Sequence, residues 1–316
     1  MPHLIFSFKC GILILSESEV TELKKILLIY IMIIGVLLSG CSGGENEKPP
    51  VEPSPSGNGG NNTVPEDGGD LKLYFFEMGK ADAFLIYNNN SAILIDTGEK
   101  GDGKDILQYM ENNNIPSLDY VIITHFDKDH IGGANKVLGN TEVKQVYVSN
   151  YPKESEEYNG FMGRIKEKSI PMTVLKEDIS FDLNGIKVEI NAPAKDLYEE
   201  DPSNNSSLIV RIGYGENSFL FMGDALAERV REYMALSPKT CDVVKMPYHG
   251  KFMGCFNEML DMLKPKYAVI TSSKEEKEAE ETRDLLEKKN VQLYRTRKGG
   301  VFMQSNGKDI TVFQGA

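Results

Sequence analysis

Cysteine is scarce in this 316-residue chain, which has four, and two of them, Cys10 and Cys41, lie in the N-terminal region. The body of the chain keeps only Cys241 and Cys255. This number is too small for the disulfide framework that holds small secreted domains together. One bridge between Cys241 and Cys255 remains open, because their spacing does not decide it. The chain is long enough to bury an apolar core without such a framework.

Basic residues are also in deficit. The chain has 35 Lys and Arg against 47 Asp and Glu, a formal net charge of −12 and a pI near 5.0. This balance argues against a large basic surface for nucleic acid. It does not exclude a nucleic-acid substrate, because bound metal ions can supply the positive charge that faces a phosphate.

Long apolar runs are missing beyond the N-terminal segment, where Ile26–Leu38 is too short to span a bilayer comfortably. This run follows Lys24-Lys25 and precedes small residues, which is the layout of a secretory signal. Leu38-Ser39-Gly40-Cys41 also resembles the lipobox of bacterial lipoproteins, in which the cysteine is lipidated. We therefore expect a leader over residues 1–41 and a mature protein anchored through Cys41 to the outside of a bacterial cell membrane. A plain uncleaved anchor is the alternative.

Residues 1–22 fit a signal segment poorly, because they add a second apolar patch, Leu4–Leu15, and acidic residues ahead of the basic flank. We expect the true start downstream, near residues 20–23. Residues 42–70 are rich in Gly, Pro and Asn and have almost nothing apolar, which predicts a flexible tether. The folded body is expected over residues 71–316.

The body alternates short apolar runs with amphipathic segments, which predicts a mixed α/β domain. Strands are expected at Leu71–Glu77, Ala83–Tyr87, Ala92–Ile95, Tyr120–Ile123, Val143–Val148, Met172–Leu175, Ile186–Ile190, Ser207–Tyr214, Ser218–Met222, Asp242–Met246, Tyr267–Ile270, Gln292–Arg295, Val301–Gln304 and Ile310–Phe313. Helices are expected at Lys104–Asn112, from about His130, and at Tyr158–Lys168, Ala225–Ala235, Cys255–Leu263 and Glu275–Lys289.

Histidine is as scarce as cysteine, with four in the chain, one of them in the leader. Two of the others lie in the stretch THFDKDHIGG (Thr124–Gly133), which follows an apolar strand and opens a helix. The stretch carries four candidate ligands: His125, Asp127, Asp129 and His130. Because two carboxylates held close together repel each other, such a cluster calls for a cation. A solvated acidic loop is the alternative, but so few histidines leave none for incidental use.

Two further strands end in candidate ligands. Asp224 follows Ser218–Met222, and His249 follows Asp242–Met246. Strands of one sheet deliver their carboxyl ends to a common edge, so these side chains can meet the THFDKDHIGG loop. The sequence therefore predicts a site for two cations.

At this point the chain resembles the metallo-β-lactamase superfamily and, within it, the soluble hydrolase domain of ComEC-type DNA-uptake competence proteins. The resemblance covers roughly residues 71–316 and implies a four-layer αββα sandwich, an α/β (α+β) fold. The matching segments are Phe76–Ile86, Ala92–Gly98, Thr124–Gly133, Asn204–Asp224, Val243–Gly250 and Lys264–Thr271.

The resemblance also implies a distribution of ligands between two metal ions. His125 and Asp127 would bind the first ion, and Asp224 would bridge both. The ligands of the second ion would be Asp129, His130 and His249. Two further carboxylates, Asp82 and Asp96 of the Asp96-Thr97-Gly98 turn, would orient loops and ligands, although an Asp that caps a turn is the alternative for each.

The chain departs from the superfamily pattern in two places. No histidine occurs between His130 and His249, where many members have a third ligand of the first ion. The corresponding region reads Asn204-Asn205-Ser206, so the first ion would be held weakly or completed by water, with Asn205 and Ser206 as candidates for a supporting or substrate role. Near His249, Tyr248 could transfer a proton and Lys251 could meet a phosphate, whereas packing and surface roles are the alternatives.

Divalent ions lower the pKa of bound water from 15.7 to about 7, which would supply a metal-bound hydroxide for hydrolysis. We expect Asp129, His249 and Tyr248 as the catalytic side chains and a phosphodiester as the substrate, with DNA as a candidate. An oxygen-rich ligand set suits zinc or manganese, with iron as a further candidate. Two other hypotheses stay open: a metallo-hydrolase of a cell-wall phosphorylcholine ester, lactone or β-lactam, and a binding lipoprotein without turnover. No protein partner can be inferred.

Overall fold

The computed structural model of this protein describes residues 5–8, 11–14 and 69–315. The chain divides into two units, Met1–Gly59 and Gly60–Ala316. In the first, strands β1 (Ile5–Phe8) and β2 (Gly11–Ile14) pair antiparallel.

Several N-terminal predictions lie outside the described residues. They concern the lipidation of Cys41, the start near residues 20–23 and most of the tether over residues 42–70. Within the described ranges, no helix combines the length and the apolar character needed to cross a membrane.

An eight-stranded sheet begins the second unit and also takes up its C-terminal hairpin. Its strands, in spatial order, are β17 (Ile310–Gln314), β16 (Val301–Ser305), β3 (Leu71–Phe75), β4 (Phe84–Tyr87), β5 (Ala92–Ile95), β6 (Ser117–Ile123), β7 (Glu142–Val148) and β8 (Met172–Val174). Neighbours from β5 to β8 run parallel. All four residues of β5 are buried, as expected for a parallel strand covered on both faces.

A seven-stranded sheet faces the first one. Its spatial order is β15 (Gln292–Arg295), β14 (Tyr267–Ile270), β13 (Val243–Lys245), β12 (Asn217–Phe221), β11 (Ile209–Tyr214), β10 (Ile186–Asn191) and β9 (Ile179–Leu183). The pairs from β12 to β15 are parallel and the others antiparallel.

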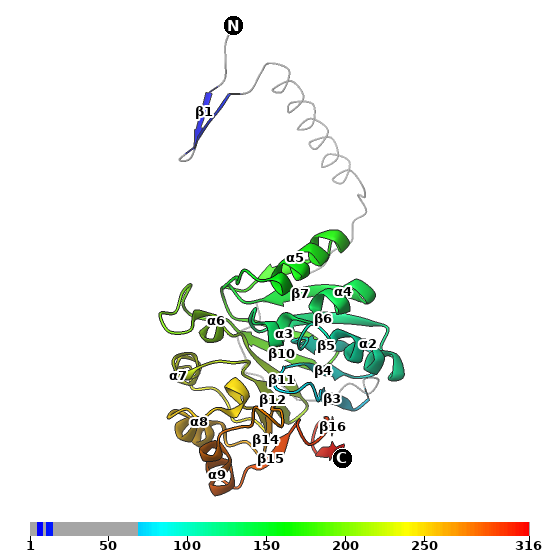
Figure 1. Cartoon of the computed structure of the whole chain (residues 1–316), viewed down its shortest axis with the longest axis vertical. Helices are drawn as coiled ribbons and strands as arrows, with labels where there is room; N and C mark the ends of the chain where they lie inside the picture. The colour runs from blue at the N-terminus through cyan, green and yellow to red at the C-terminus, as the bar shows by residue number, and fades with distance from the viewer. Residues whose placement is uncertain (1–4, 9–10, 15–68, 316) are drawn as a thin grey trace, which may run out of the picture. The chain divides into compact units, whose positions relative to one another are not determined.

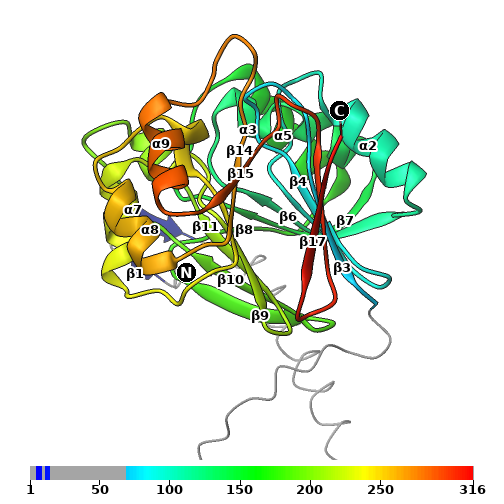
Figure 2. The same cartoon turned by 90° about the horizontal axis from the view of Figure 1, so that it is seen from below.

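Helices cover the outer face of each sheet (Figures 1 and 2). Those on the eight-stranded sheet are α2 (Gly103–Asn112), α4 (Ala134–Asn140) and α5 (Glu156–Lys168), with the short α3 (Lys128–Ile131) between α2 and α4 in sequence. Those on the seven-stranded sheet are α7 (Ala227–Ala235), α8 (Phe256–Leu263) and α9 (Glu280–Lys288). In α8, buried Phe256, Met259, Leu260 and Leu263 recur at helical spacing, which fixes the face turned to the sheet.

Three apolar clusters correspond to the three interfaces of four stacked layers: one lies between the sheets and one under each set of helices. Between the sheets, the Phe221 ring of β12 lies 5.7 Å from Phe75 and 5.2 Å from Phe84, measured between centroids. Burying each such ring stabilises the fold by about 1.5–3 kcal/mol. The structure therefore confirms the predicted four-layer αββα sandwich.

In the second unit, one strand was not predicted. β9 pairs with β10 through the two-residue turn Asn184-Gly185, where both residues have positive φ, at 50° and 83°. Asn-Gly between two alternating segments is the strongest short signal of a β-hairpin, and it was present in the sequence. A second unpredicted element is the short helix α6 (Pro202–Asn205).

The predicted helix Glu275–Lys289 is wrong over its first turn, because α9 begins only at Glu280. The preceding segment is held in a loop by the buried Glu278 side chain. This carboxylate accepts hydrogen bonds from Arg297 at 2.9 and 3.1 Å and from Ser272 at 3.2 Å. Ala279 then donates its amide to Gly250 O at 3.2 Å. Long-range contacts thus override helix propensity here.

The two body cysteines, Cys241 and Cys255, are both buried and free. The bridge left open by the sequence does not form in this structure.

Candidate metal centre

The THFDKDHIGG loop leaves the carboxyl end of β6 and turns into α3. It brings its two imidazoles together, with the ring centroids of His125 and His130 4.0 Å apart and both rings fully buried. His125 Nε2 lies 4.0 Å from Asp127 Oδ1. The close approach of the loop to the neighbouring Asp96-Thr97-Gly98 turn requires glycine, because a Cβ on Gly133 would lie 2.2 Å from Thr97 O.

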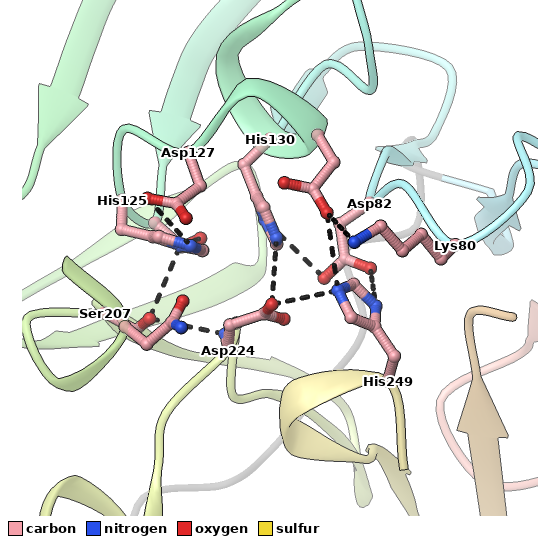
Figure 3. A network of polar contacts seen from close by, with 12 residues as sticks. Lys80, Asp82, His125, Asp127, His130, Ser207, Asp224 and His249 are labelled. Atoms are coloured by element: carbon pink, nitrogen blue, oxygen red, sulfur yellow. Dashed lines mark hydrogen bonds and ion pairs between the residues drawn. The ribbon is translucent and has the colours of Figure 1, made fainter. Parts of the chain in front are cut away.

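The other two predicted ligands arrive from the facing sheet (Figure 3). Asp224 follows β12, and His249 lies in the turn Pro247–Gly250 after β13. His249 Nε2 lies 2.9 Å from Asp224 Oδ2. On the other side of this carboxylate, His130 Nε2 lies 3.4 Å from the same oxygen. The site is therefore built from both sheets.

The six predicted ligands form a row, which we call the ligand row: His125, Asp127, Asp129, His130, Asp224 and His249. Its open end consists of His125 and Asp127, and its buried end of Asp129, His130 and His249. His249 Nε2 lies 3.7 Å from Asp129 Oδ2 at the buried end. Asp224 stands between the two ends. Donor atoms of two trios lie within 4.8 Å of one another: His125, His130 and Asp224, and Asp129, His130 and His249.

The backbone around His249 is in an uncommon conformation. Tyr248 and His249 both have left-handed φ values, 49° and 52°. Such geometry costs of order 1–3 kcal/mol per residue and persists only where the surroundings enforce it. The Tyr248 amide donates to Gly223 O at 3.3 Å, next to Asp224, which ties this turn to the carboxylate between the two ends of the row.

The hydrogen bonds of the ring Nδ1 atoms fix which nitrogen of each histidine faces the row. Thr271 donates its only hydroxyl hydrogen to Asp82 Oδ1 at 2.6 Å, so its oxygen accepts from His249 Nδ1 at 3.0 Å. In the neutral ring this arrangement places the hydrogen on Nδ1 and directs the Nε2 lone pair at the row.

The rings of His125 and His130 are oriented in the same way. Thr124 donates to Asp96 Oδ2 at 2.7 Å and therefore accepts from His125 Nδ1 at 3.1 Å. His130 Nδ1 donates directly to Asp96 Oδ2 at 2.8 Å. Asp82 and Asp96 thus lie behind the ligands and orient them, which is the role expected for them from the resemblance.

The candidate ligand atoms of the row have few partners within the part of the protein that the structure describes. The Nε2 atoms of His125, His130 and His249 are buried, and within residues 69–315 none has a hydrogen-bond partner of good geometry. Asp224 Oδ1 is in the same situation. Unsatisfied buried donors and acceptors are costly, and imidazole nitrogens next to carboxylate oxygens are the ligands that zinc, manganese and iron take. The residues present fit divalent ions.

A buried cation beneath the row was missed by the sequence analysis. Lys245, the last residue of β13, is fully buried, forms an ion pair with Asp82, and lies 3.6 Å from Asp224 Oδ1. Burial lowers the pKa of Lys245, but Asp82 and Asp224 outweigh this effect and raise it overall, so the ammonium stays charged. A lysine inside the apolar run Asp242–Met246 was the available signal.

Hydroxyl groups and two partly exposed lysines also contact the row. Ser203 donates to Asp127, and Lys153 Nζ lies 2.7 Å from Asp127 Oδ1. At the buried end, Lys80 Nζ lies 3.3 Å from Asp129 Oδ2. Ser207 Oγ lies 3.4 Å from His125 Nδ1 and accepts the Asp224 amide at 3.3 Å. No sequence pattern marked these residues.

The charges of the row prepare it for cations. Burial raises the pKa of the Asp224 carboxyl, but His249 and His130 outweigh it and hold this pKa well below its ordinary range. Burial and the neighbouring His130 lower the pKa of His125 to about 3, which keeps this ring neutral. For His130, burial is outweighed by carboxylates led by Asp224, and the pKa is raised well above its usual value. A cation that binds at His130 therefore displaces a proton.

Four candidate residues make other contacts. Lys251 Nζ lies over the Tyr248 ring, 4.4 Å from its centroid, so these two side chains pair with each other. Asn205 donates its side-chain amide to Glu200 O at 2.7 Å, and Ser206 donates to Ser203 O at 2.8 Å. Asn205 and Ser206 therefore stabilise their own loop, while the contacts to the row come from Ser203 and Ser207 on either side.

Comparisons with known proteins agree with this site. Residues 78–272 match the profile of the "Metallo-beta-lactamase superfamily". The chain is 26% identical over 208 residues to "ComE operon protein 3" of Bacillus subtilis (strain 168), covering 62% of this chain and 26% of that protein. It is 27% identical over 206 residues to "Recombination protein 2" of Haemophilus influenzae, covering 63% and 24%. The chain thus spans about a quarter of the length of these relatives.

Among solved structures, the metallo-beta-lactamase fold protein YhfI from Bacillus subtilis superposes with a TM-score of 0.51 at 11% identity. The superposition covers 75% of this chain and 100% of that one, and supports the fold alone. The sequence matches confirm the predicted resemblance to ComEC-type competence proteins. Since the profile match extends over most of the unit Gly60–Ala316, the chain belongs to the metallo-β-lactamase superfamily.

Proposed function

We propose that this protein is a metal-dependent phosphodiesterase or nuclease that holds two divalent ions in the ligand row. The observation that carries the proposal is the convergence of three imidazole Nε2 atoms and the carboxylates of Asp127, Asp129 and Asp224 in the ligand row. Members of the superfamily typically bind divalent metals as a pair and are generally hydrolases. The sequence similarity to ComEC-type proteins favours a phosphodiester over other substrates.

In this proposal His125 and Asp127 would hold one ion, Asp129, His130 and His249 would hold the other, and Asp224, which lies between the two ends of the row, would be shared. Bound divalent ions activate water and polarise a phosphoryl group, and zinc, manganese and iron all suit these ligands. The chain's own groups orient the rest. Asp129, whose pKa is lowered overall by His130, His249 and Lys80 despite its burial, is ionised at neutral pH and can accept a proton from an attacking water.

The test is hydrolysis of bis-p-nitrophenyl phosphate by the purified protein after chelation and after re-addition of Mn²⁺ or Zn²⁺. We expect turnover to be lost on chelation and restored by metal. Asp129→Asn should abolish turnover, whereas the exposed Asp105→Asn should not change it. Elemental analysis should find about two ions per chain.

The same assay separates the alternatives. Hydrolysis of p-nitrophenyl phosphorylcholine, a lactone or nitrocefin, but not of bis-p-nitrophenyl phosphate, would identify a metallo-hydrolase with a different substrate. Metal binding without turnover of any substrate would leave a binding protein.

We further propose that the protein is lipid-anchored outside the cytoplasm through Cys41. The support is the lipobox-like sequence that ends at this residue. Replacement of Cys41 by Ala should move the protein out of the membrane fraction, and its retention there would contradict the proposal.

A further inference from the structure

Two lysines flank the ligand row at opposite ends. Figure 3 shows Lys80 and Asp127 on opposite sides of His130, and Lys153 lies beside Asp127. Lys153 Nζ is 2.7 Å from Asp127 Oδ1, and Lys80 Nζ is 3.3 Å from Asp129 Oδ2. Each end of the row thus has one ammonium group beside its outer carboxylate.

The charge balance of the site does not require these two lysines once metals are present. Five carboxylates lie in or directly behind the row: Asp82, Asp96, Asp127, Asp129 and Asp224. Two divalent ions and the buried ammonium of Lys245 would together neutralise these five negative charges. Lys80 and Lys153 then add positive charge that the protein itself does not compensate within the row, which suits an anionic ligand.

Exposure separates these lysines from Lys245. The Lys245 side chain is 0% exposed, whereas that of Lys80 is 29% exposed and that of Lys153 is 43% exposed. Both have room to turn from a carboxylate toward solvent. For Lys80 a second carboxylate, Glu276, lies only 3.7 Å away, and Glu276 is itself 59% exposed. An ion bound to Asp127 or Asp129 would repel the neighbouring ammonium group. This repulsion would turn the lysine side chain toward solvent.

We propose that Lys80 and Lys153 bind negatively charged groups of the substrate at the two ends of the row, and so make the site selective for anionic esters. This inference rests on the proposed function. It replaces Lys251, the phosphate-binding candidate suggested by sequence, with two residues that contact the row. An ammonium bound to an anionic phosphate oxygen gains both a hydrogen bond and the attraction of opposite charges, whereas a neutral triester offers only a weaker hydrogen bond to its P=O oxygen.

The experiment compares bis-p-nitrophenyl phosphate with its neutral methyl triester, which has the same leaving group. Lys80→Met and Lys153→Met should each lower kcat/KM for the anionic diester about tenfold, and change it less than about twofold for the triester. Lys80→Arg and Lys153→Arg should recover most of the activity on the diester, because the positive charge is kept.

Lys144→Met is the matched control. Lys144 Nζ also lies 2.7 Å from a carboxylate, that of Asp119, but this pair is near the other end of β6 from the His125 loop. The control should leave both substrates unaffected. Elemental analysis should find the same metal content in all variants.

Equal losses on the diester and the triester, no loss on either, or reduced metal content would overturn the inference, since the lysines would then have a structural or metal-retaining role. A wild-type protein that hydrolyses neither ester would instead contradict the proposed function. The lysines can still be tested in that case by calorimetric titration of the metal-loaded protein with inorganic phosphate. Binding weakened about tenfold in each Met variant supports the inference, and unchanged binding overturns it.

Discussion

The two ends of the ligand row differ in how their imidazoles are supported. At the buried end, His130 donates to the Asp96 carboxylate, and His249 donates to a Thr271 hydroxyl that is itself bound to Asp82. At the open end, His125 reaches Asp96 through the Thr124 hydroxyl, and Ser207 is the other hydroxyl beside its Nδ1, so this ring does not donate directly to a carboxylate as His130 does. Carboxylate-backed imidazoles are the stronger metal ligands.

The carboxylates follow the same division. The Asp129 side chain is 9% exposed, against 25% for Asp127, which is shared with both Lys153 and Ser203. An ion at the open end would have to compete for Asp127 with these two groups. The two ends should therefore differ in their affinity for metal ions. The buried end should fill first, and an ion at the open end should exchange more readily.

Loss of the bridging carboxylate should erase the difference between the ends, and it is the largest effect expected. Asp224→Ala removes the residue that both ends share, so both ions should be lost and hydrolysis should fall at least about a hundredfold. His125→Ala, by contrast, should leave about one ion per chain. Elemental analysis and diester hydrolysis measure both variants, and full metal content in Asp224→Ala would refute the bridging role.

The cations behind and beside the row should differ in their effect on stability. Lys245→Met leaves the buried Asp82 carboxylate without its cationic partner, which should lower the free energy of unfolding by about 3–5 kcal/mol. Lys153→Met, at a partly exposed pair, should cost less than about 1 kcal/mol. Urea denaturation of the metal-free proteins measures both. Equal losses would show that the buried Lys245 and the partly exposed Lys153 contribute equally to stability.

The loop that follows β14 gives the buried end a pH-dependent support. Burial raises the pKa of Glu278, but Arg297 and its other hydrogen-bond donors outweigh this and lower it from 4.5 to about 2. Because the folded-state pKa is depressed, the stabilisation is fully present above pH 4.5 and is lost as the pH falls toward 2. Glu278→Gln should cost about 2 kcal/mol at pH 7, a value reduced because solvent reaches the arginines.

Denaturation of wild type and Glu278→Gln across this range measures the effect. The difference in unfolding free energy should shrink between pH 4.5 and 2. A difference that stays constant with pH would assign the loss to packing rather than to charge.

The smallest effect concerns the groups behind each imidazole. Asp96→Asn removes the carboxylate bound directly to His130 and, through Thr124, to His125, and should weaken metal binding about tenfold, whereas Ser207→Ala at the open end should weaken it only about twofold. Competition with a chromophoric chelator measures both affinities. A larger effect of Ser207→Ala would reverse the proposed order of the two ends.

Much of this fold could be predicted from the sequence, because its strands and helices have local signals. The continuous apolar runs Phe84–Tyr87 and Ala92–Ile95 and the helical spacing in Phe256–Leu263 locate these elements to within a few residues. The hairpin of β9 and β10 could have been predicted as well, from Asn184-Gly185. The start of α9 could not, because Glu278 is held by Arg297, a partner that follows it in the chain by a whole helix and strand.

The site shows the same limit. Topology alone could predict that the side chains of the THFDKDHIGG loop meet Asp224 and His249, because all of them lie at strand ends. Lys80, Lys153 and Lys245 could not, since a lysine near a motif carries no sign of which carboxylate it will reach. Asn205 and Ser206 were chosen by position, but the loop turns them inward and presents Ser203 and Ser207 instead.

The row draws its ligands from both sheets, with the His125 loop on one and Asp224 and His249 on the other. Ions bound there would act as a cross-link between the two halves of the sandwich. Ligand binding to the folded state alone raises stability with ligand concentration, so the melting temperature of this protein should serve as a gauge of its metal occupancy. The metal ions proposed for catalysis would then also hold the two sheets together.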